Sequence, residues 1–186
     1  MRSVAARAVG LAARGDTNAV VELLRNVGRV LNPSAAEGGR SAAQDGLRTR
    51  PTSSIELGDA RSHATIFPLR RGAVLPLHDH PAMTVVSKVL HGRMRVESFE
   101  WADRDGLLAR VLDARDVDEN AEPLVIDGTL HRIIALADCA FIDVFAPYYD
   151  EARPCRYYRI VDRRDGGVVL LEPTVAVPYR AGDHRS

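Results

Sequence analysis

The sequence contains little cysteine: Cys139 and Cys155 are the only two among 186 residues. Small secreted domains depend on networks of several disulfides, which two cysteines cannot form. The sequence therefore favours a reducing compartment, and we expect a cytoplasmic protein. The N-terminus leaves one alternative open, because three arginines and no acidic residue precede Asp16. Mitochondrial transit peptides begin with the same basic, acid-free composition, so a mitochondrial location is the alternative.

Long hydrophobic runs and an excess of charge of one sign are also missing. A membrane-spanning helix needs about 20 consecutive apolar residues, and arginine, aspartate or glycine interrupts the longest apolar stretches of this chain. Lysine plus arginine and aspartate plus glutamate number 25 each, so the formal net charge is zero. That balance gives no overall attraction to nucleic acid or to anionic lipid. We therefore expect neither a nucleic acid nor a membrane as partner, and the lack of an apolar interface segment favours a monomer.

The N-terminal part is predicted to hold one amphipathic helix. From Asp16 the apolar residues recur at helical spacing, and Asp16 or Thr17 is placed to cap the amides of the first turn. Pro33 ends this helix, and the small, polar residues that follow are typical of a linker. We accordingly divide the chain into an N-terminal helix with a flexible linker, a β-rich domain and a C-terminal tail, at residues 1–52, 53–175 and 176–186.

Short runs of valine, isoleucine and leucine follow the linker, separated by glycine, proline and aspartate. Many short strands with such punctuation are typical of a β-barrel or a β-sandwich. The dipeptide His91-Gly92 fits a tight hairpin turn between two of these runs. The predicted strands are residues 65–69, 74–78, 84–90, 93–101, 107–113, 124–126, 131–135, 140–145, 157–161 and 168–172.

Two histidines on one predicted strand give the first chemical signal. His78 and His80 are two positions apart, so their imidazoles point to the same face of a strand. Such a pair is often only a surface feature, but here it lies in an apolar, strand-rich region. His131 is the natural third ligand, because Gly128 lets the backbone turn and bring its ring inward. Three imidazoles form a facial triad that leaves the opposite side of a divalent metal open.

These spacings resemble the two metal-binding motifs of the cupin barrel. Gly72 and Gly92 flank the histidine pair, and a Gly-X-X-His sequence ending at His131 follows about fifty residues later. The cupin pattern places a glutamate ligand four or five residues after the second histidine, where this chain has Thr84 and Val85. The resemblance implies a mainly β fold, a cupin-type double-stranded β-helix (jelly-roll barrel) with an N-terminal amphipathic helix. It also implies a three-histidine site without a carboxylate.

A longer segment resembles one particular family among the cupins. Residues 76–92, PLHDHPAMTVVSKVLHG, look like the signature of the cysteamine dioxygenase and plant cysteine oxidase family of cupin thiol dioxygenases. The segments AFIDV and APYY within residues 140–149, and RPCRYYR at residues 153–159, occur in that family's order and approximate spacing. The match covers residues 66–161, about half of the chain.

Two departures from the family pattern stand close to these motifs. The family commonly has Pro-Gly after the second histidine, where this chain has Pro81-Ala82. It also commonly has Pro-Pro-Tyr after the aspartate, where this chain has Pro147-Tyr148-Tyr149. Neither departure replaces an expected metal ligand.

Carried over by position, the resemblance implies that the three histidines bind Fe(II). It also implies that Asp143 and Tyr149 line the substrate side of the pocket. Cys155 and Tyr157 match a Cys-X-Tyr pair that forms a thioether cross-link in some animal members. Other members keep similar residues without that bond, so the cross-link stays open for this chain.

The implied activity is that of a non-haem Fe(II)-dependent thiol dioxygenase. Such an enzyme inserts both atoms of O2 into cysteamine or into the N-terminal cysteine of a peptide and yields a sulfinic acid. Neutral imidazoles leave the full dipositive charge on the iron, which favours a substrate thiolate. Asp143 is suited to orient the substrate amine, and Tyr149 to donate a hydrogen bond to bound oxygen. With a peptide substrate, the family implies oxygen-dependent marking of proteins for degradation and therefore oxygen sensing.

The residues also allow simpler interpretations. Asp143 can pair with one of the many arginines, and the tyrosines can be half-buried strand aromatics. Cys139 fits a small buried hydrophobe, whereas His63, His91 and His184 stand in polar or turn contexts typical of exposed side chains.

The chain can also be a non-catalytic cupin that binds a metal or small ligand, or a cupin enzyme of different chemistry, such as an isomerase or a carbon-cleaving dioxygenase.

Overall fold

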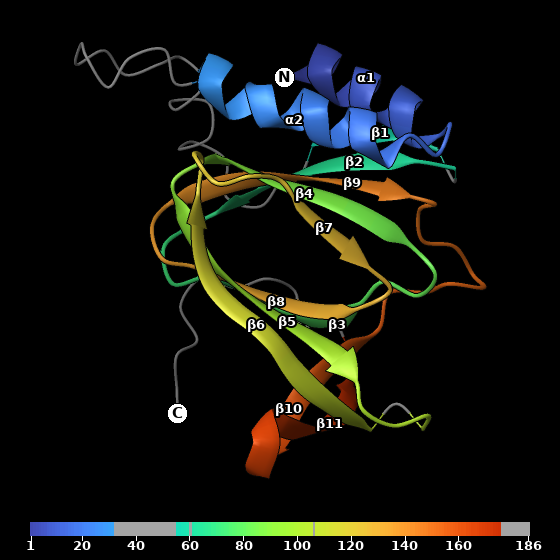
Figure 1. Cartoon of the computed structure of the whole chain (residues 1–186), viewed down its shortest axis with the longest axis vertical. Coiled ribbons are helices and arrows are strands. Elements are labelled where there is room, and N and C mark those ends of the chain that lie inside the picture. The colour runs from blue at the N-terminus through green and yellow to red at the C-terminus, as the bar shows by residue number, and fades with distance from the viewer. Residues whose placement is uncertain (32–54, 60, 106, 176–186) are drawn as a thin grey trace.

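The computed structural model describes residues 1–31, 55–59, 61–105 and 107–175. The predicted linker from residue 32 onward and the predicted tail lie outside the described residues. Within the described part, two helices precede eleven strands (Figure 1). The elements are α1 (Arg2–Ala12), α2 (Thr17–Leu31), β1 (Ile55–Gly58), β2 (His63–Leu69), β3 (Val74–Asp79), β4 (Thr84–His91), β5 (Arg93–Trp101), β6 (Leu108–Asp118), β7 (Leu124–Asp127), β8 (Leu130–Ala135), β9 (Cys139–Ala146), β10 (Tyr157–Arg163), the 3-10 helix η1 (Asp165–Gly167) and β11 (Val168–Thr174).

The helix predicted from Asp16 is confirmed as α2. The Asp16 Oδ1 atom accepts a hydrogen bond from the Ala19 amide at 3.0 Å, which satisfies one of the amides that a first helical turn leaves without a partner. The preceding helix α1 was not predicted, although its alanines have high helix propensity. Ala5, Ala8 and Ala12 are buried on one face of α1. Neither helix is long and apolar enough to cross a lipid bilayer.

The strands form two antiparallel sheets, which confirms the predicted mainly β jelly-roll fold. One sheet has five strands in the order β1-β2-β9-β4-β7, and β10-β11-β6-β5-β8-β3 close on themselves in a ring. The inside of the barrel is the space between these two sheets, where side chains of both pack together. Both helices lie over the outer face of the five-stranded sheet, while the β10–β11 pair lies at the far end of the molecule (Figure 1). All ten predicted strands are present, β6 being longer than predicted, and β1 is an additional strand.

The hairpin predicted at His91-Gly92 is wrong. β4 pairs with β7 and β9, whereas β5 pairs with β6 and β8, so the chain passes from one sheet to the other at this point. Gly92 has a φ of +78°, and a Cβ at this position would stand 2.2 Å from the carbonyl oxygen of Asp138. Glycine is therefore required by a close backbone approach at the corner between the sheets.

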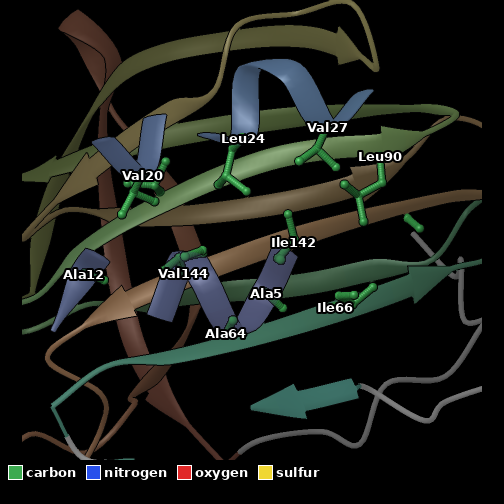
Figure 2. Close-up of a cluster of buried hydrophobic side chains, with 13 residues drawn as sticks. Ala5, Ala12, Val20, Leu24, Val27, Ala64, Ile66, Leu90, Ile142 and Val144 are labelled. Carbon is green, nitrogen blue, oxygen red and sulfur yellow. The ribbon is translucent and has the colours of Figure 1, made fainter. Parts of the chain in front are cut away.

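Strand β9 lies between two parts of the hydrophobic core. Ile142 and Val144 pack against Leu24 and other helix residues on its outer face (Figure 2). Phe141 and Phe145, at the alternate positions, pack inside the barrel. Because side chains alternate along a strand, each residue of β9 is assigned to one of these two cores. This alternation decides which side chains of β9 reach the interior where the site is built.

Candidate metal centre

The three predicted metal ligands lie together inside the barrel. β3 and β8 pair in a register that places His78 directly opposite His131, and His80 follows at the end of β3. Their exposed fractions are 5%, 0% and 0% for His78, His80 and His131. One ring nitrogen of each histidine lies within 4.8 Å of the corresponding atoms of the other two. The structure thus gathers three imidazoles from two neighbouring strands at one buried point.

Hydrogen bonds fix the tautomers of two of these rings. The Nδ1 atom of His78 donates to the carbonyl oxygen of Pro76 at 2.8 Å. The Tyr149 hydroxyl donates to the carbonyl oxygen of Asp79 at 3.0 Å, which leaves the phenol oxygen able to accept a hydrogen bond from the His80 Nδ1, 2.7 Å away. Both rings therefore turn an unprotonated Nε2 towards the centre.

The third ring completes an arrangement that fits a cation. The Nε2 atoms of His80 and His131 are only 3.3 Å apart. A single proton can join two such atoms, whereas a metal ion can be bound by all three converging nitrogens at once. His131 Nδ1 is buried and has no hydrogen-bond partner among the described residues, so no neighbour there fixes the tautomer of this ring. The donor set of three imidazoles suits iron, zinc, copper or nickel rather than magnesium or calcium.

Burial keeps the three imidazoles neutral at physiological pH. It lowers the pKa of His78 from 6.5 to about 4. It also lowers the pKa of His80 to about 3, with a further contribution from the charge of His78, and that of His131 well below its ordinary value. Metal binding requires neutral imidazoles, so none of these rings has to lose a positive charge before a metal binds at pH 7.

Asp143 reaches the same interior from the opposite sheet. It lies on β9 between Phe141 and Phe145, whose rings point into the barrel, and is 1% exposed. Thr65 and Ser87 flank it on the neighbouring strands, and both are also buried. Burial raises the pKa of Asp143 from 3.8 to about 7, and the nearby Ser87 hydroxyl opposes part of this rise.

The Asp143 carboxyl group is not fully satisfied within the described residues. Its Oδ1 atom and the Ser87 hydroxyl oxygen have no hydrogen bond of good geometry there. No arginine forms an ion pair with it in this part of the chain, so the structure gives no support to the simpler interpretation of a structural ion pair. A buried carboxyl oxygen without a partner is costly, and a cationic or hydrogen-bonding ligand would relieve that cost.

Tyr149, Cys155 and Tyr157 stand beside the histidines. Tyr157 pairs with His78 across β10 and β3, and their ring centroids are 5.8 Å apart. The Cys155 thiol lies within hydrogen-bonding reach of both phenol groups. Burial raises the pKa of all three groups, so they are uncharged at neutral pH. The charge of Asp143 makes a smaller contribution to the raised pKa of Tyr149.

Two residues of this region are more buried than the sequence indicated. His63, predicted to be exposed, is only 9% exposed and stacks on Tyr148 with 4.0 Å between ring centroids. Asp79, between the two ligands of β3, was not singled out and is 4% exposed. The alternation along β2 is a signal for His63, because Phe67 on the same face is packed inside the barrel. His91 is exposed and Cys139 is buried, as predicted.

Comparison with known proteins identifies similar sequences. The PCO_ADO family model matches residues 29–174. Plant cysteine oxidase 1 of Arabidopsis thaliana is 35% identical in an alignment of 114 positions that covers 50% of this chain and 36% of that protein. The probable 2-aminoethanethiol dioxygenase of Dictyostelium discoideum is 33% identical over 58% of this chain and 55% of that protein. The mouse 2-aminoethanethiol dioxygenase is 32% identical over 52% and 49%, respectively. The chain thus spans about half the length, or less, of these curated relatives.

Solved structures with a similar fold are more distant in sequence. KdgF from Halomonas sp. is 24% identical, with a TM-score of 0.42, over 53% of this chain and 81% of that chain. Oxalate decarboxylase from Bacillus subtilis is 23% identical, with a TM-score of 0.41, over 53% and 24%, respectively.

Proposed function

Because the chain belongs to the PCO_ADO family, we propose that it is a non-haem Fe(II)-dependent thiol dioxygenase. It acts on cysteamine or on the N-terminal cysteine of a peptide. Both atoms of O2 pass to the sulfur, which converts the thiol to a sulfinic acid without any further reductant. The observation that carries the proposal is the set of three buried, neutral imidazoles whose Nε2 atoms converge with no carboxylate among them.

The histidine ligands have a defined part in this activity. His78, His80 and His131 would hold Fe(II), which when bound activates O2 and accepts the substrate thiolate. Three neutral ligands contribute no negative charge, so the site is left to take its anion from the substrate. The carbonyl of Pro76 and the hydroxyl of Tyr149 keep the first two rings in the required tautomer.

Asp143 is proposed to bind the substrate amine. A carboxyl group with a pKa of about 7 ionises readily when an ammonium group comes alongside it, and its Oδ1 has an open acceptor position within the described residues. No arginine residue of the described chain is fully buried, so none is enclosed beside Asp143 in the interior to bind a substrate carboxylate. Cysteamine and a peptide N-terminus, in which the carbon next to the amine carries no free carboxylate, are therefore favoured over free cysteine.

The remaining predicted residues are proposed to shape the pocket. Tyr149 fixes the ring of His80 and presents its phenol group near Asp143. Cys155 and Tyr157 form the wall beside His78, where their uncharged side chains exclude water from the sulfur that is to be oxidised. A monomeric state and a cytoplasmic location remain predictions from the sequence.

A competition assay tests the proposed activity. Fe(II)-loaded protein receives O2 and equal concentrations of cysteamine, free cysteine and a peptide that begins with cysteine. Mass spectrometry then detects a gain of about 32 Da, the mass of two oxygen atoms, on each thiol. We expect the gain on cysteamine, on the peptide, or on both, and much less on free cysteine. N-acetylated cysteamine is the matched control, because it keeps the thiol but cannot present an ammonium group to Asp143.

The possible outcomes separate the candidate functions. Oxidation of the peptide supports a protein-directed, oxygen-sensing enzyme, and oxidation of cysteamine alone supports a metabolic one. Equal oxidation of N-acetylated cysteamine contradicts the assignment of the amine to Asp143. Stoichiometric metal binding without any 32 Da gain contradicts the dioxygenase proposal and favours the non-catalytic cupin.

A further inference from the structure

Asp79 directs all of its polar groups to the segment that contains the pocket wall. Its amide donates to the carbonyl oxygen of Arg156 at 3.1 Å, and its Oδ1 accepts from the Arg156 amide at 2.9 Å. Its Oδ2 accepts from the Tyr158 hydroxyl at 3.2 Å, and its carbonyl oxygen accepts from the Tyr149 hydroxyl at 3.0 Å. We call the contacts of Asp79 with Arg156 and Tyr158 the Asp79 clamp. This clamp connects the strand of two metal ligands with the chain around Cys155.

The clamp lies on the opposite face of β3 from the histidines. Side chains alternate along a strand, so His78 points to the metal centre while Leu77 and Asp79 point away from it. Leu77 and Tyr158 pack in one hydrophobic cluster, and Tyr158 also contacts Trp101 with 5.3 Å between ring centroids. On β10 the same alternation places Tyr157 towards the metal centre and Tyr158 towards the clamp.

Few backbone pairs hold β10 on β3. Among the described residues, the two strands pair at only two positions, Tyr157 with His78 and Tyr158 with Leu77. β10 also pairs with β11 at six positions, so the short ladder is where the β10–β11 pair joins the strand that carries His78. A slip of one residue in this ladder would turn the side chains of β10 to the other face relative to β3. Tyr157 would then leave the metal centre. The contacts that fix the register therefore decide what the pocket wall presents.

We propose that Asp79 is a positioning residue that fixes the register of β10 on β3 and thereby holds Cys155 and Tyr157 beside the metal centre. The effect of this register on thiol oxidation rests on the proposed function, whereas the register itself does not. Asp79 touches neither substrate nor metal in this proposal. It acts through Arg156 and Tyr158, on the far side of the strand.

Hydrogen–deuterium exchange, measured by mass spectrometry on the protein as purified, tests the clamp. Asp79→Leu has a similar volume and removes both carboxylate acceptors, whereas Asp79→Asn keeps an acceptor for the Arg156 amide and a polar partner for Tyr158. Glu97→Gln is the matched control, since the partly buried Glu97 pairs with Arg132, next to the third histidine, and does not contact β10. Exchange in β10 is compared with exchange in β9 of the same protein, which separates a local effect from general destabilisation.

In Asp79→Leu we expect the amides of β10 to exchange roughly tenfold faster or more, relative to β9, because one buried and one partly buried hydrogen bond are lost. Asp79→Asn restores most of the protection, and Glu97→Gln leaves the ratio of β10 to β9 within about twofold of the wild type. Tyr158→Phe, which removes one bond only, gives an intermediate increase and decides the test if Asp79→Leu does not fold.

Two results would overturn the proposal. One is an unchanged exchange ratio in Asp79→Leu or, where that variant does not fold, in Tyr158→Phe. The other is an equal increase in Glu97→Gln. The same variants are assayed for thiol oxidation, which we expect to fall in Asp79→Leu well below the Glu97→Gln level. If the wild-type protein oxidises no thiol, the proposed function fails, while the exchange ratios still decide whether the clamp exists.

Discussion

Replacement of Asp143 by asparagine is expected to stabilise the fold and to impair the proposed reaction. Burial raises the pKa of this carboxyl group from 3.8 to about 7, which makes its ionisation in the folded state cost on the order of 4 kcal/mol. Asparagine has nearly the same shape and never ionises. The variant therefore avoids a cost that the wild-type protein bears at neutral pH.

The sign of the pH dependence follows from the two protonation states. Between pH 4 and 7 the folded protein keeps the Asp143 proton and the unfolded chain has lost it, so wild-type stability falls as pH rises through this range. Above pH 7 both states are ionised and the loss is complete. The free energy of unfolding of Asp143→Asn, minus that of the wild type, should thus grow by about 2 to 3 kcal/mol between pH 5 and pH 8.

Urea unfolding at pH 5, 6, 7 and 8, followed by the fluorescence of Trp101, measures this difference. A chelator is present throughout, because a bound metal would add its own stabilisation. The three buried histidines titrate in both proteins alike, so their contribution cancels. Asp116→Asn is the control, since Asp116 is exposed and paired with Arg95. A difference that stays flat from pH 5 to pH 8, or that moves in favour of the wild type, refutes the reasoning.

The same variant separates stability from function. Loss of a charged partner for the substrate amine should lower kcat/KM for cysteamine by roughly 10 to 100-fold, the effect of a lost charge-assisted hydrogen bond. Steady-state oxygen consumption measures this change. Full activity in Asp143→Asn would leave the carboxyl group without its proposed role.

Further variants test single features of the structure. In His131→Ala, metal affinity should fall by roughly 100-fold or more, since one of three ligands is lost; calorimetric titration with Co(II) measures it, and unchanged binding would exclude this site. Tyr149→Phe should lower the same affinity by roughly 10 to 100-fold, and Tyr157→Phe much less; equal losses would contradict the tautomer argument. Lys88→Met removes two hydrogen bonds to backbone carbonyls and should lower the free energy of unfolding by about 2 to 4 kcal/mol in urea. Ala82→Gly should raise it by about 1 kcal/mol, because Ala82 has a φ of +51°; a lower value would show that no strain is relieved.

The fold could be predicted from the sequence where the signal is local. Alternating apolar residues and glycine or proline boundaries identified ten strands, including residues 93–101 with the bounds that the structure shows. The hairpin predicted at His91-Gly92 was wrong for a non-local reason, because the same dipeptide can form either a hairpin turn or a connection between two sheets. Only the pairing of β4 with β9, some fifty residues away, decides between them. Helix α1 was missed because its alanine and arginine composition equally fits a targeting segment.

The site could be predicted in so far as alternation on one strand determines it. His78 and His80 had to share a face, and a glycine marked the approach of His131. The burial of His63 and Asp79 was not predictable in this way. It depends on Tyr148 and on β10, which come from the distant C-terminal part of the chain.

Asp79 and Asp143 show how two buried carboxyl groups near one site acquire different roles. Burial raises the pKa of both, so the shift alone does not distinguish them. Their hydrogen bonds do, because both oxygens of Asp79 are satisfied by Arg156 and Tyr158, whereas Asp143 has an oxygen without a partner among the described residues. A buried carboxylate whose two oxygens both accept hydrogen bonds joins two segments of the chain. A ligand that competed for those donors would weaken the connection. A buried carboxyl group with an oxygen that lacks a partner destabilises the fold, and in the proposed reaction a substrate with an ammonium group offsets that cost when it binds.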